Sequence, residues 1–494
     1  MRKTAILFGS LLAIWAGLAL AADDTSIPRP IPLTRPELKE LIENMKARTP
    51  RIILPELTDE EKAKLGDRGG GYEGRLRQLY MPCGQTGQGG ADRQRDAVAG
   101  ATPVTGTTPA PGGQPGQGGR GNDNRGQADP KMTLDYKFKT QLFWIVSRTN
   151  NCQYCLGHQE GKLLAAGMKD DEIAGLDGDW SEFSPAERAA YAFARQFTYE
   201  PQRFCDADID KLRPHYTDLQ ILEMIMSMAG NNSINRWKEG VGVPQSARVG
   251  GSGRGSAEGA AAAAEPPRER KTYLTPTSEK FQKTITKVAP IQVDEKGEPN
   301  TSTVCRRPPL ESRPEVEQAL ANCYKRAPRL PLVDEAEARE VLPEGWPEGP
   351  LPQWVRLVAN FPRDGKSRVN TMFTADTKGD LTPLTKAQVS WIIARQDRAW
   401  YAVGQAQKKL RKLGQTDEQI FALDGSWEGF SQAERAVFTV ARKLAATPVV
   451  LTDDDFAAAV KLVGPRDVVQ LVHFTTTRAA FDRITEAAGL QLEP

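Results

Sequence analysis

The feature that most constrains the fold of this 494-residue chain is an internal repeat with a fixed offset of 247 positions. Three segments and one arginine recur at this offset. The pairs are 144–148 with 391–395, 176–180 with 423–427, 183–189 with 430–436, and Arg236 with Arg483. One offset is kept from residue 144 to residue 236, which chance does not explain. The sequence therefore predicts two copies of one domain in tandem.

The residue pattern within both copies is helical. From residue 132 to about 243, apolar side chains recur at helical spacing, and no stretch alternates as a strand would. Ser184, Pro185 and Glu187 form a strong helix start, with an N-cap, a first-turn proline and a capping-box acid. The sequence therefore predicts an all-α protein with two helical domains joined by flexible linkers.

Composition sets the expected boundaries. Gly and Pro, with 44 and 35 residues, gather in segments almost free of large apolar side chains, and such segments cannot bury enough surface to fold. We expect seven segments: a signal peptide at 1–21, an arm and first helices at 22–83, a disordered insertion at 84–128, the first helical domain at 129–243, a flexible linker at 244–272, a Pro-rich intermediate region at 273–345, and the second domain at 346–494.

The N-terminus has the pattern of an export signal. Arg2 and Lys3 precede an apolar run from 4 to 18, and Ala19-Leu20-Ala21 is a small-x-small cleavage site. This predicts a periplasmic or secreted protein, with an uncleaved anchor as the alternative. Charge is nearly balanced, with 65 basic and 63 acidic residues, so no nucleic-acid partner is expected.

Six cysteines are too few for a disulfide scaffold in a chain of this length. Cys305 and Cys323 could form one bridge, whereas Cys83 and Cys205 have no evident partner. The remaining two belong to a C-x2-C-x2-H motif, which is Cys152, Cys155 and His158.

This motif predicts a redox-active dithiol with a proton-transfer partner. Asn150 and Asn151 are good N-cap residues, so we expect Cys152 in the first turn of a helix, where the helix dipole favours a thiolate. Cys155 and His158 follow at three-residue steps and can share one side of that helix.

The second copy keeps the neighbouring residues and lacks the reactive ones. At the offset of 247, Cys152, Cys155 and His158 correspond to Ala399, Ala402 and Gln405, while Tyr154 and Gly157 are retained as Tyr401 and Gly404. The three reactive residues are therefore not needed for the fold. We expect the first copy to carry the activity and the second to act as its packing partner.

Two other interpretations of the motif stay open. A zinc site would need a fourth ligand, which His215 or Cys205 could supply. A structural disulfide between Cys152 and Cys155 would form readily in an oxidising compartment. A c-type haem is excluded because Leu156, not histidine, follows Cys155.

The chain resembles the carboxymuconolactone decarboxylase/alkylhydroperoxidase D-like family. The resemblance rests on the motif at 150–158, the Ser-Pro-Ala-Glu-Arg helix at 184–188 and the Asn-Asn-Ser-Ile-Asn-Arg-Trp helix at 231–237. It covers about 132–243 well and about 351–490 as a degenerate copy. The family's known members include peroxidases and decarboxylases, and they form trimers and hexamers.

The resemblance implies that Cys155 attacks a peroxide, Cys152 resolves the product as a disulfide, and His158 relays protons. The peroxidases also carry a glutamate on the preceding helix, where this chain has Thr140. Glu160 is expected to be a solvated surface carboxylate that does not replace it.

The expected function is that of an exported, peroxidase-like thiol oxidoreductase without cofactor or metal. Its partners would be a hydroperoxide or another small molecule and an unidentified thiol reductant, with a homo-oligomer possible. The alternatives are a lactone decarboxylase-like lyase and a non-enzymatic exported binding protein.

Several conspicuous side chains have plain structural interpretations. We expect His215 at the surface and His473 in helix packing. Trp180 and Trp427 recur in both copies and should lie in the core. A structural polar network is expected from Asn231, Asn232, Asn235 and Arg236.

Overall fold

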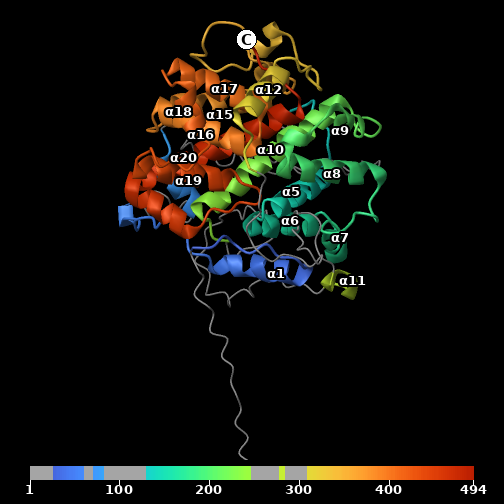
Figure 1. Cartoon of the computed structure of the whole chain (residues 1–494). Helices are drawn as coiled ribbons and strands as arrows, with labels where there is room; N and C mark the ends of the chain where they lie inside the picture. The colour runs from blue at the N-terminus through green and yellow to red at the C-terminus, as the bar shows by residue number, and fades with distance from the viewer. Residues whose placement is uncertain (1–25, 61–70, 83–128, 246–276, 284–308) are drawn as a thin grey trace, which may run out of the picture.

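The computed structural model describes residues 26–60, 71–82, 129–245, 277–283 and 309–494, and this part is built of helices without a strand (Figure 1). The predicted all-α fold is confirmed. The expected signal peptide, the 84–128 insertion and most of the 244–272 linker lie outside the described residues, as do Cys83 and Cys305. Among the described helices, none is long and apolar enough to cross a membrane.

Five helices of the first part of the chain have counterparts 247 residues later. The pairs are α5 (Tyr136–Thr149) with α16 (Pro383–Asp397), α6 (Gln153–Ala165) with α17 (Trp400–Lys412), α7 (Asp170–Gly175) with α18 (Asp417–Ala422), α8 (Pro185–Tyr199) with α19 (Gln432–Ala445), and α10 (Asp218–Val241) with α20 (Asp453–Ala487). Helix α20 is kinked at Gly464, whose φ is 85°, and the segment beyond the kink matches α10. We call residues 26–245 the first half and residues 309–494 the second half.

The remaining helices are shorter or lie outside these pairs. They are α1 (Arg35–Asn44), η1 (Met45–Ala47), α3 (Tyr72–Tyr80), η3 (Pro201–Arg203), α9 (Asp206–Asp210), α11 (Glu279–Gln282), α12 (Arg313–Cys323), α13 (Glu335–Arg339), α14 (Gln353–Val358) and α15 (Pro362–Thr377).

The two tryptophans of the repeat have the same unusual conformation. Trp180 and Trp427 have φ values of 62° and 64°, in the left-handed region that bulky residues rarely adopt. Their indole nitrogens donate to the carbonyls of Leu176 and Leu423 at 2.8 and 2.7 Å. Both side chains are buried, so the predicted core positions are confirmed.

Helices α10 and α20 pack against each other in the middle of the molecule (Figure 1). A Cβ atom on Gly240 would lie 2.6 Å from Val472 Cγ1, so a larger residue there would force the helices apart. The absent side chain at Gly240 is therefore part of the reason that the two halves meet so closely.

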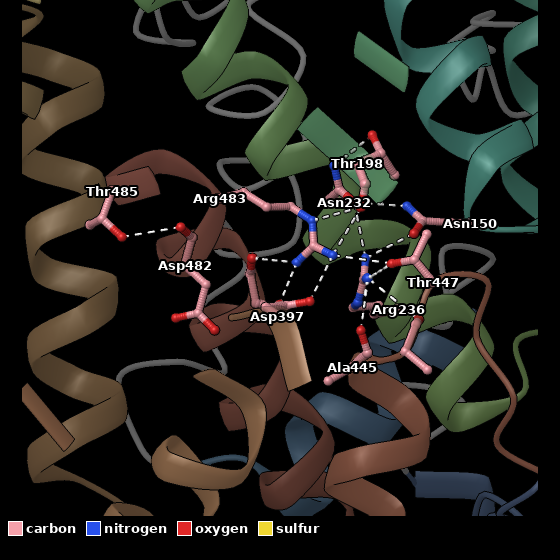
Figure 2. Close-up of polar contacts among 12 residues, drawn as sticks. Asn150, Thr198, Asn232, Arg236, Asp397, Ala445, Thr447, Asp482, Arg483 and Thr485 are labelled. Atoms are coloured by element: carbon pink, nitrogen blue, oxygen red, sulfur yellow. Dashed lines mark hydrogen bonds and ion pairs between the residues drawn. The ribbon is translucent and has the colours of Figure 1, made fainter. Parts of the chain in front are cut away.

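Two buried arginines cross between the halves in the same way (Figure 2). Arg236 Nη2 donates to Ala445 O at 3.1 Å, and Arg483 Nη2 donates to Thr198 O at 3.1 Å. Ala445 and Thr198 are themselves related by the offset of 247. Both arginines also donate to Thr447 Oγ1, at 2.7 and 3.1 Å. Reciprocal contacts of this kind are the mark of a two-fold interface.

A second repeat, which sequence analysis missed, lies in the arms that precede each half. Residues 35–52 match residues 313–330 at an offset of 278, and the identical pairs include Arg35/Arg313, Pro36/Pro314, Arg48/Arg326, Pro50/Pro328 and Arg51/Arg329. We call residues 26–52 the first arm and residues 309–330 the second arm. Part of the Pro-rich region 273–345 is thus the counterpart of the first arm.

The arms also cross between the halves reciprocally. Arg51 of the first arm donates to Leu451 O at 2.9 Å, and Arg329 of the second arm donates to Phe204 O at 2.9 Å. Phe204 and Leu451 are again 247 residues apart. Each arm therefore ties its own half to the other one.

Candidate functional site

The two cysteines of the motif lie at the junction of α5 and α6. Asn150 is the C-cap of α5, Asn151 has a left-handed φ of 59°, and Cys152 is the N-cap of α6 with φ −93° and ψ 90°. The prediction that Asn150 or Asn151 caps the helix and Cys152 lies in its first turn is therefore wrong. The two asparagines form the tight turn between α5 and α6, so α6 begins later in the sequence than predicted.

The second half makes the same junction without thiols. Arg398 has φ 53°, and Ala399 has φ −85° and ψ 87°, close to the values of Asn151 and Cys152. The backbone of this turn is therefore independent of the side chains that could react.

The structure brings the two thiols together in the interior. Cys152 Sγ and Cys155 Sγ are 2.8 Å apart, and the two residues are 0% and 4% exposed. A disulfide has a sulfur–sulfur distance of about 2.05 Å, so a small shift of either side chain would allow the bond to form.

The electrostatic surroundings favour the protonated form of Cys152. Burial raises its pKa well above the usual value, and the hydrogen bond with Cys155 and the negative charge of Glu239 raise it further. The prediction that the helix N-terminus would favour a thiolate at Cys152 is therefore wrong in this state. Desolvation of a fully buried sulfur outweighs the partial charge at the helix end.

Glu239, near the end of α10, is a residue of this site that sequence analysis missed. Its Oε2 lies 3.4 Å from Arg29 Nε and 3.3 Å from Arg48 Nη2, and its backbone carbonyl accepts from Arg51 Nη1 at 2.7 Å. We call Arg29, Arg48 and Arg51 the arginine cage. The match of Glu239 to Glu486 at the offset of 247 was the available signal.

The arginine cage keeps Glu239 ionised in the interior. Burial alone would raise the pKa of Glu239, but Arg48, Arg29 and Arg51 outweigh it, and a hydrogen bond from Cys152 adds to their effect, so the pKa is lowered. Burial in turn lowers the pKa of Arg48 to about 10. The site thus holds a charged carboxylate beside a neutral thiol.

His158 lies one turn beyond Cys155 on α6, as predicted. Its ring is half-buried and faces the ring of Tyr154, with centroids 4.7 Å apart and a tilt of 52°. It is more accessible than either thiol. A half-buried imidazole can exchange protons with solvent.

The first arm covers the junction that carries the thiols. Asn151 Nδ2 donates to Pro30 O at 3.2 Å, and Arg148 Nη2 donates to Pro32 O at 2.5 Å. On the other side, Gln245 Nε2 donates to Tyr154 O at 3.5 Å. The first arm and Gln245 thus contact the residues on either side of the two buried thiols.

Glu160 is not the surface carboxylate that sequence analysis predicted. It is 1% exposed, and it pairs with Arg35 Nη1 at 2.6 Å and with Lys39 Nζ at 2.8 Å. Burial alone would raise the pKa of Glu160, but these two cations lower it to about 2. Its partners lie on α1, far away in sequence, and no local pattern indicated them.

Thr140 carries no acid into the site. It is buried, and its hydroxyl donates to Tyr136 O at 2.8 Å. Its neighbour Lys139 pairs with Glu223 at 2.9 Å. The carboxylate beside the thiols thus comes from α10, as Glu239, and not from α5.

The other predicted structural residues lie as expected. Asn231, Asn232, Asn235 and Arg236 form a buried network, in which Asn150 Nδ2 donates to Asn232 Oδ1 at 2.8 Å (Figure 2). His215 is exposed. His473 is buried against Trp237, and burial lowers its pKa to about 3.

The described part of the chain brings together no set of ligands for a zinc ion. No group of three or more His, Cys, Asp or Glu side chains there could hold a metal ion. Cys205 and His215, the predicted fourth ligands, are both exposed, whereas Cys152 and Cys155 are buried.

No protein-family model matches the chain, and no curated protein matches it significantly. The resemblance to the alkylhydroperoxidase D-like family therefore depends on the motifs of the sequence alone.

Proposed function

We propose that the chain is an exported, peroxidase-like thiol oxidoreductase made of two tandem helical domains, with the chemistry confined to the first. The observation that carries the proposal is the pair of sulfurs 2.8 Å apart, at a turn whose counterpart holds alanines in the same backbone conformation. A pair of thiols added to a backbone that does not need them is best explained by their reactivity.

The tandem arrangement is supported by the reciprocal contacts between the halves. The Arg236–Ala445 and Arg483–Thr198 hydrogen bonds are related by the offset of 247, and the Arg51 and Arg329 contacts are related in the same way. The second domain takes the place that a second subunit would occupy in a homodimer. The expected linkers and the signal peptide remain part of this proposal.

In the proposed cycle, the Cys155 sulfur attacks the terminal oxygen of a hydroperoxide R–O–OH. The O–O bond breaks, the alkoxide leaves as R–OH with the proton of the Cys155 thiol, which His158 relays, and Cys155 becomes a sulfenic acid. The Cys152 sulfur then displaces the hydroxyl group, which leaves as water with the Cys152 proton, and the disulfide forms. Two thiols of an external reductant restore the dithiol by exchange.

The burial of both thiols favours a second candidate, an exported binding protein in which Cys152 and Cys155 form a structural disulfide. At 0% and 4% exposure, and beneath the first arm, the bond would be protected from reductants. This candidate predicts a disulfide that does not cycle.

The test is hydroperoxide consumption by the full chain with dithiothreitol as reductant. We expect turnover by the wild type, loss of at least 100-fold in Cys155→Ser, and no change in Cys205→Ser, which removes an exposed cysteine outside the site. Wild-type protein that consumes no peroxide would contradict the proposal. Activity on a lactone that survives Cys155→Ser would favour the lyase instead.

A further inference from the structure

The Glu239 carboxylate uses its two oxygens differently from its counterpart in the second half. Oε2 of Glu239 faces Arg29 and Arg48, whereas the buried Oε1 has no hydrogen-bond partner among the described residues. In the second half, Glu486 Oε1 accepts from the backbone nitrogen of Tyr401 at 3.2 Å, and Arg326 Nη1 lies 3.1 and 2.9 Å from its two oxygens.

This difference distinguishes the carboxylate beside Cys152 from its counterpart in the second half. The carboxylate, an arginine and the arm are common to both halves, so they are part of the fold. The unengaged Oε1 belongs to the half that carries the Cys152–Cys155 pair, and the Cys152 thiol interacts with the Glu239 carboxylate.

We propose that Glu239 is a positioning residue that holds the proton on Cys152 and so leaves Cys155 as the sulfur that attacks. The role assigned to Cys155 rests on the proposed function, whereas the effect on Cys152 does not. A carboxylate beside a sulfur in the interior disfavours a second negative charge there.

The charged and titratable groups around Cys152 come from three elements. Cys155 faces it from α6 and Glu239 from α10, and Arg48 follows η1. Arg29 and Arg51 act on Glu239 from the first arm. Burial and the negative charge of Glu239 favour the protonated form of Cys152. The positive charge of Arg48 favours the thiolate.

The order of steps in the cycle follows from this arrangement. While Cys152 keeps its proton, Cys155 is the sulfur available for the O–O bond. Once Cys155 is a sulfenic acid, Cys152 closes the disulfide and its proton leaves in the water that is released. Glu239 is unchanged at the end, and no further reactant is needed.

The test measures alkylation of Cys152 by iodoacetamide in the full chain carrying Cys155→Ser, without peroxide. The readout is the rate at pH 8 divided by the rate at pH 10.5, because a change in access alone scales both rates equally. We expect Glu239→Gln to raise this ratio at least tenfold, since it removes a negative charge and leaves the arginine cage uncompensated. Glu486→Gln is the matched control and should leave the ratio unchanged.

A second variant, with the opposite expected effect on the ratio, keeps the test decisive if Glu239→Gln fails to fold. Arg48→Gln should lower the ratio, and Arg326→Gln, its match in the second half, should not change it. An unchanged or lowered ratio in folded Glu239→Gln would overturn the inference, and so would a raised ratio in Arg48→Gln. If the wild type consumes no peroxide while these ratios shift as expected, the proposed function fails and the role of Glu239 stands.

Discussion

The two halves differ in the three side chains of the proposed site. Cys152, Cys155 and His158 stand where the second half has Ala399, Ala402 and Gln405, while Glu239 and Glu486 occupy matching positions. The chain thus contains its own control for the site, because the same backbone and the same carboxylate occur with and without the thiols. Single-residue experiments can exploit this pairing.

Replacement of Cys152 by serine should separate the two steps of the cycle. Cys155 can still be oxidised, but no second thiol lies 2.8 Å away to displace the hydroxyl group. We expect one equivalent of peroxide to leave a sulfenic acid at Cys155 that persists, measured by dimedone labelling and peptide mass spectrometry. A dimedone adduct at Cys205 in place of Cys155 would contradict the assignment.

Glu160 should make the free energy of unfolding depend on pH in the acidic range. Its pKa is about 2 in the folded state against 4.5 for an unperturbed glutamate, so its contribution is fully present above pH 4.5 and is lost as the pH falls toward 2. This shift corresponds to roughly 3 kcal/mol.

Glu160→Gln should therefore destabilise the protein by about 3 kcal/mol near neutral pH and flatten the acid limb of stability, measured by urea unfolding across pH 2–7. Glu182→Gln removes an exposed partner of Lys280 and should change stability by less than about 0.5 kcal/mol. Equal effects of the two variants would show that burial of Glu160 is unimportant.

Among the elements, the two arms and their contacts were the hardest to predict from the sequence. Their repeat has an offset of 278 rather than 247, because the spacing between arm and domain differs in the two halves. The helices of the repeat could be predicted because caps, prolines and apolar spacing are local signals. The contacts of Arg48 and Arg51 with Glu239 join distant segments, and such contacts leave no periodic trace in the sequence.

The matched arginines Arg51 and Arg329 allow the role of each arm to be tested. Each donates to carbonyls of both halves, so Arg51→Ala and Arg329→Ala should each destabilise the protein by about 2–3 kcal/mol. Only Arg51→Ala should loosen the cover of the dithiol. We expect it to raise the rate of Cys152 and Cys155 alkylation at least tenfold.

Arg329→Ala is the control for this measurement, because it weakens the arm of the half that lacks the Cys-x2-Cys pair. Alkylation of Cys152 and Cys155 that rises equally in both variants would mean that global unfolding, and not the first arm, controls access to the thiols.

At the scale of the whole molecule, the sequence predicted the all-α fold and the proximity of Cys152 and Cys155, because both depend on patterns within one segment. It did not predict that Glu239 would face Cys152 or that Glu160 would be buried. Both carboxylates are held by arginine or lysine side chains from the first arm, and that packing is decided by tertiary structure. The thiolate expectation failed for the same reason, since burial was not visible in the sequence.

The pseudo-two-fold packing predicts the behaviour of a half chain. A fragment of residues 22–245 leaves the α10 face, including Arg236 and Gly240, without the second half. We expect it to form a homodimer in which Arg236 donates to Thr198 O of the other copy, measured by sedimentation velocity. A well-folded monomer would show that the pseudo-two-fold packing does not drive association.

The proposed function requires that Cys152 and Cys155 form a dithiol that cycles. The most direct measurement is a count of free thiols in the purified full chain before and after one equivalent of hydroperoxide, with the disulfide located by peptide mass spectrometry, and again after reduction. We expect two thiols to disappear, the bond to join Cys152 to Cys155, and the reductant to restore both thiols. A pair that stays reduced under peroxide, or a bridge that no reductant opens in the folded protein, would contradict it.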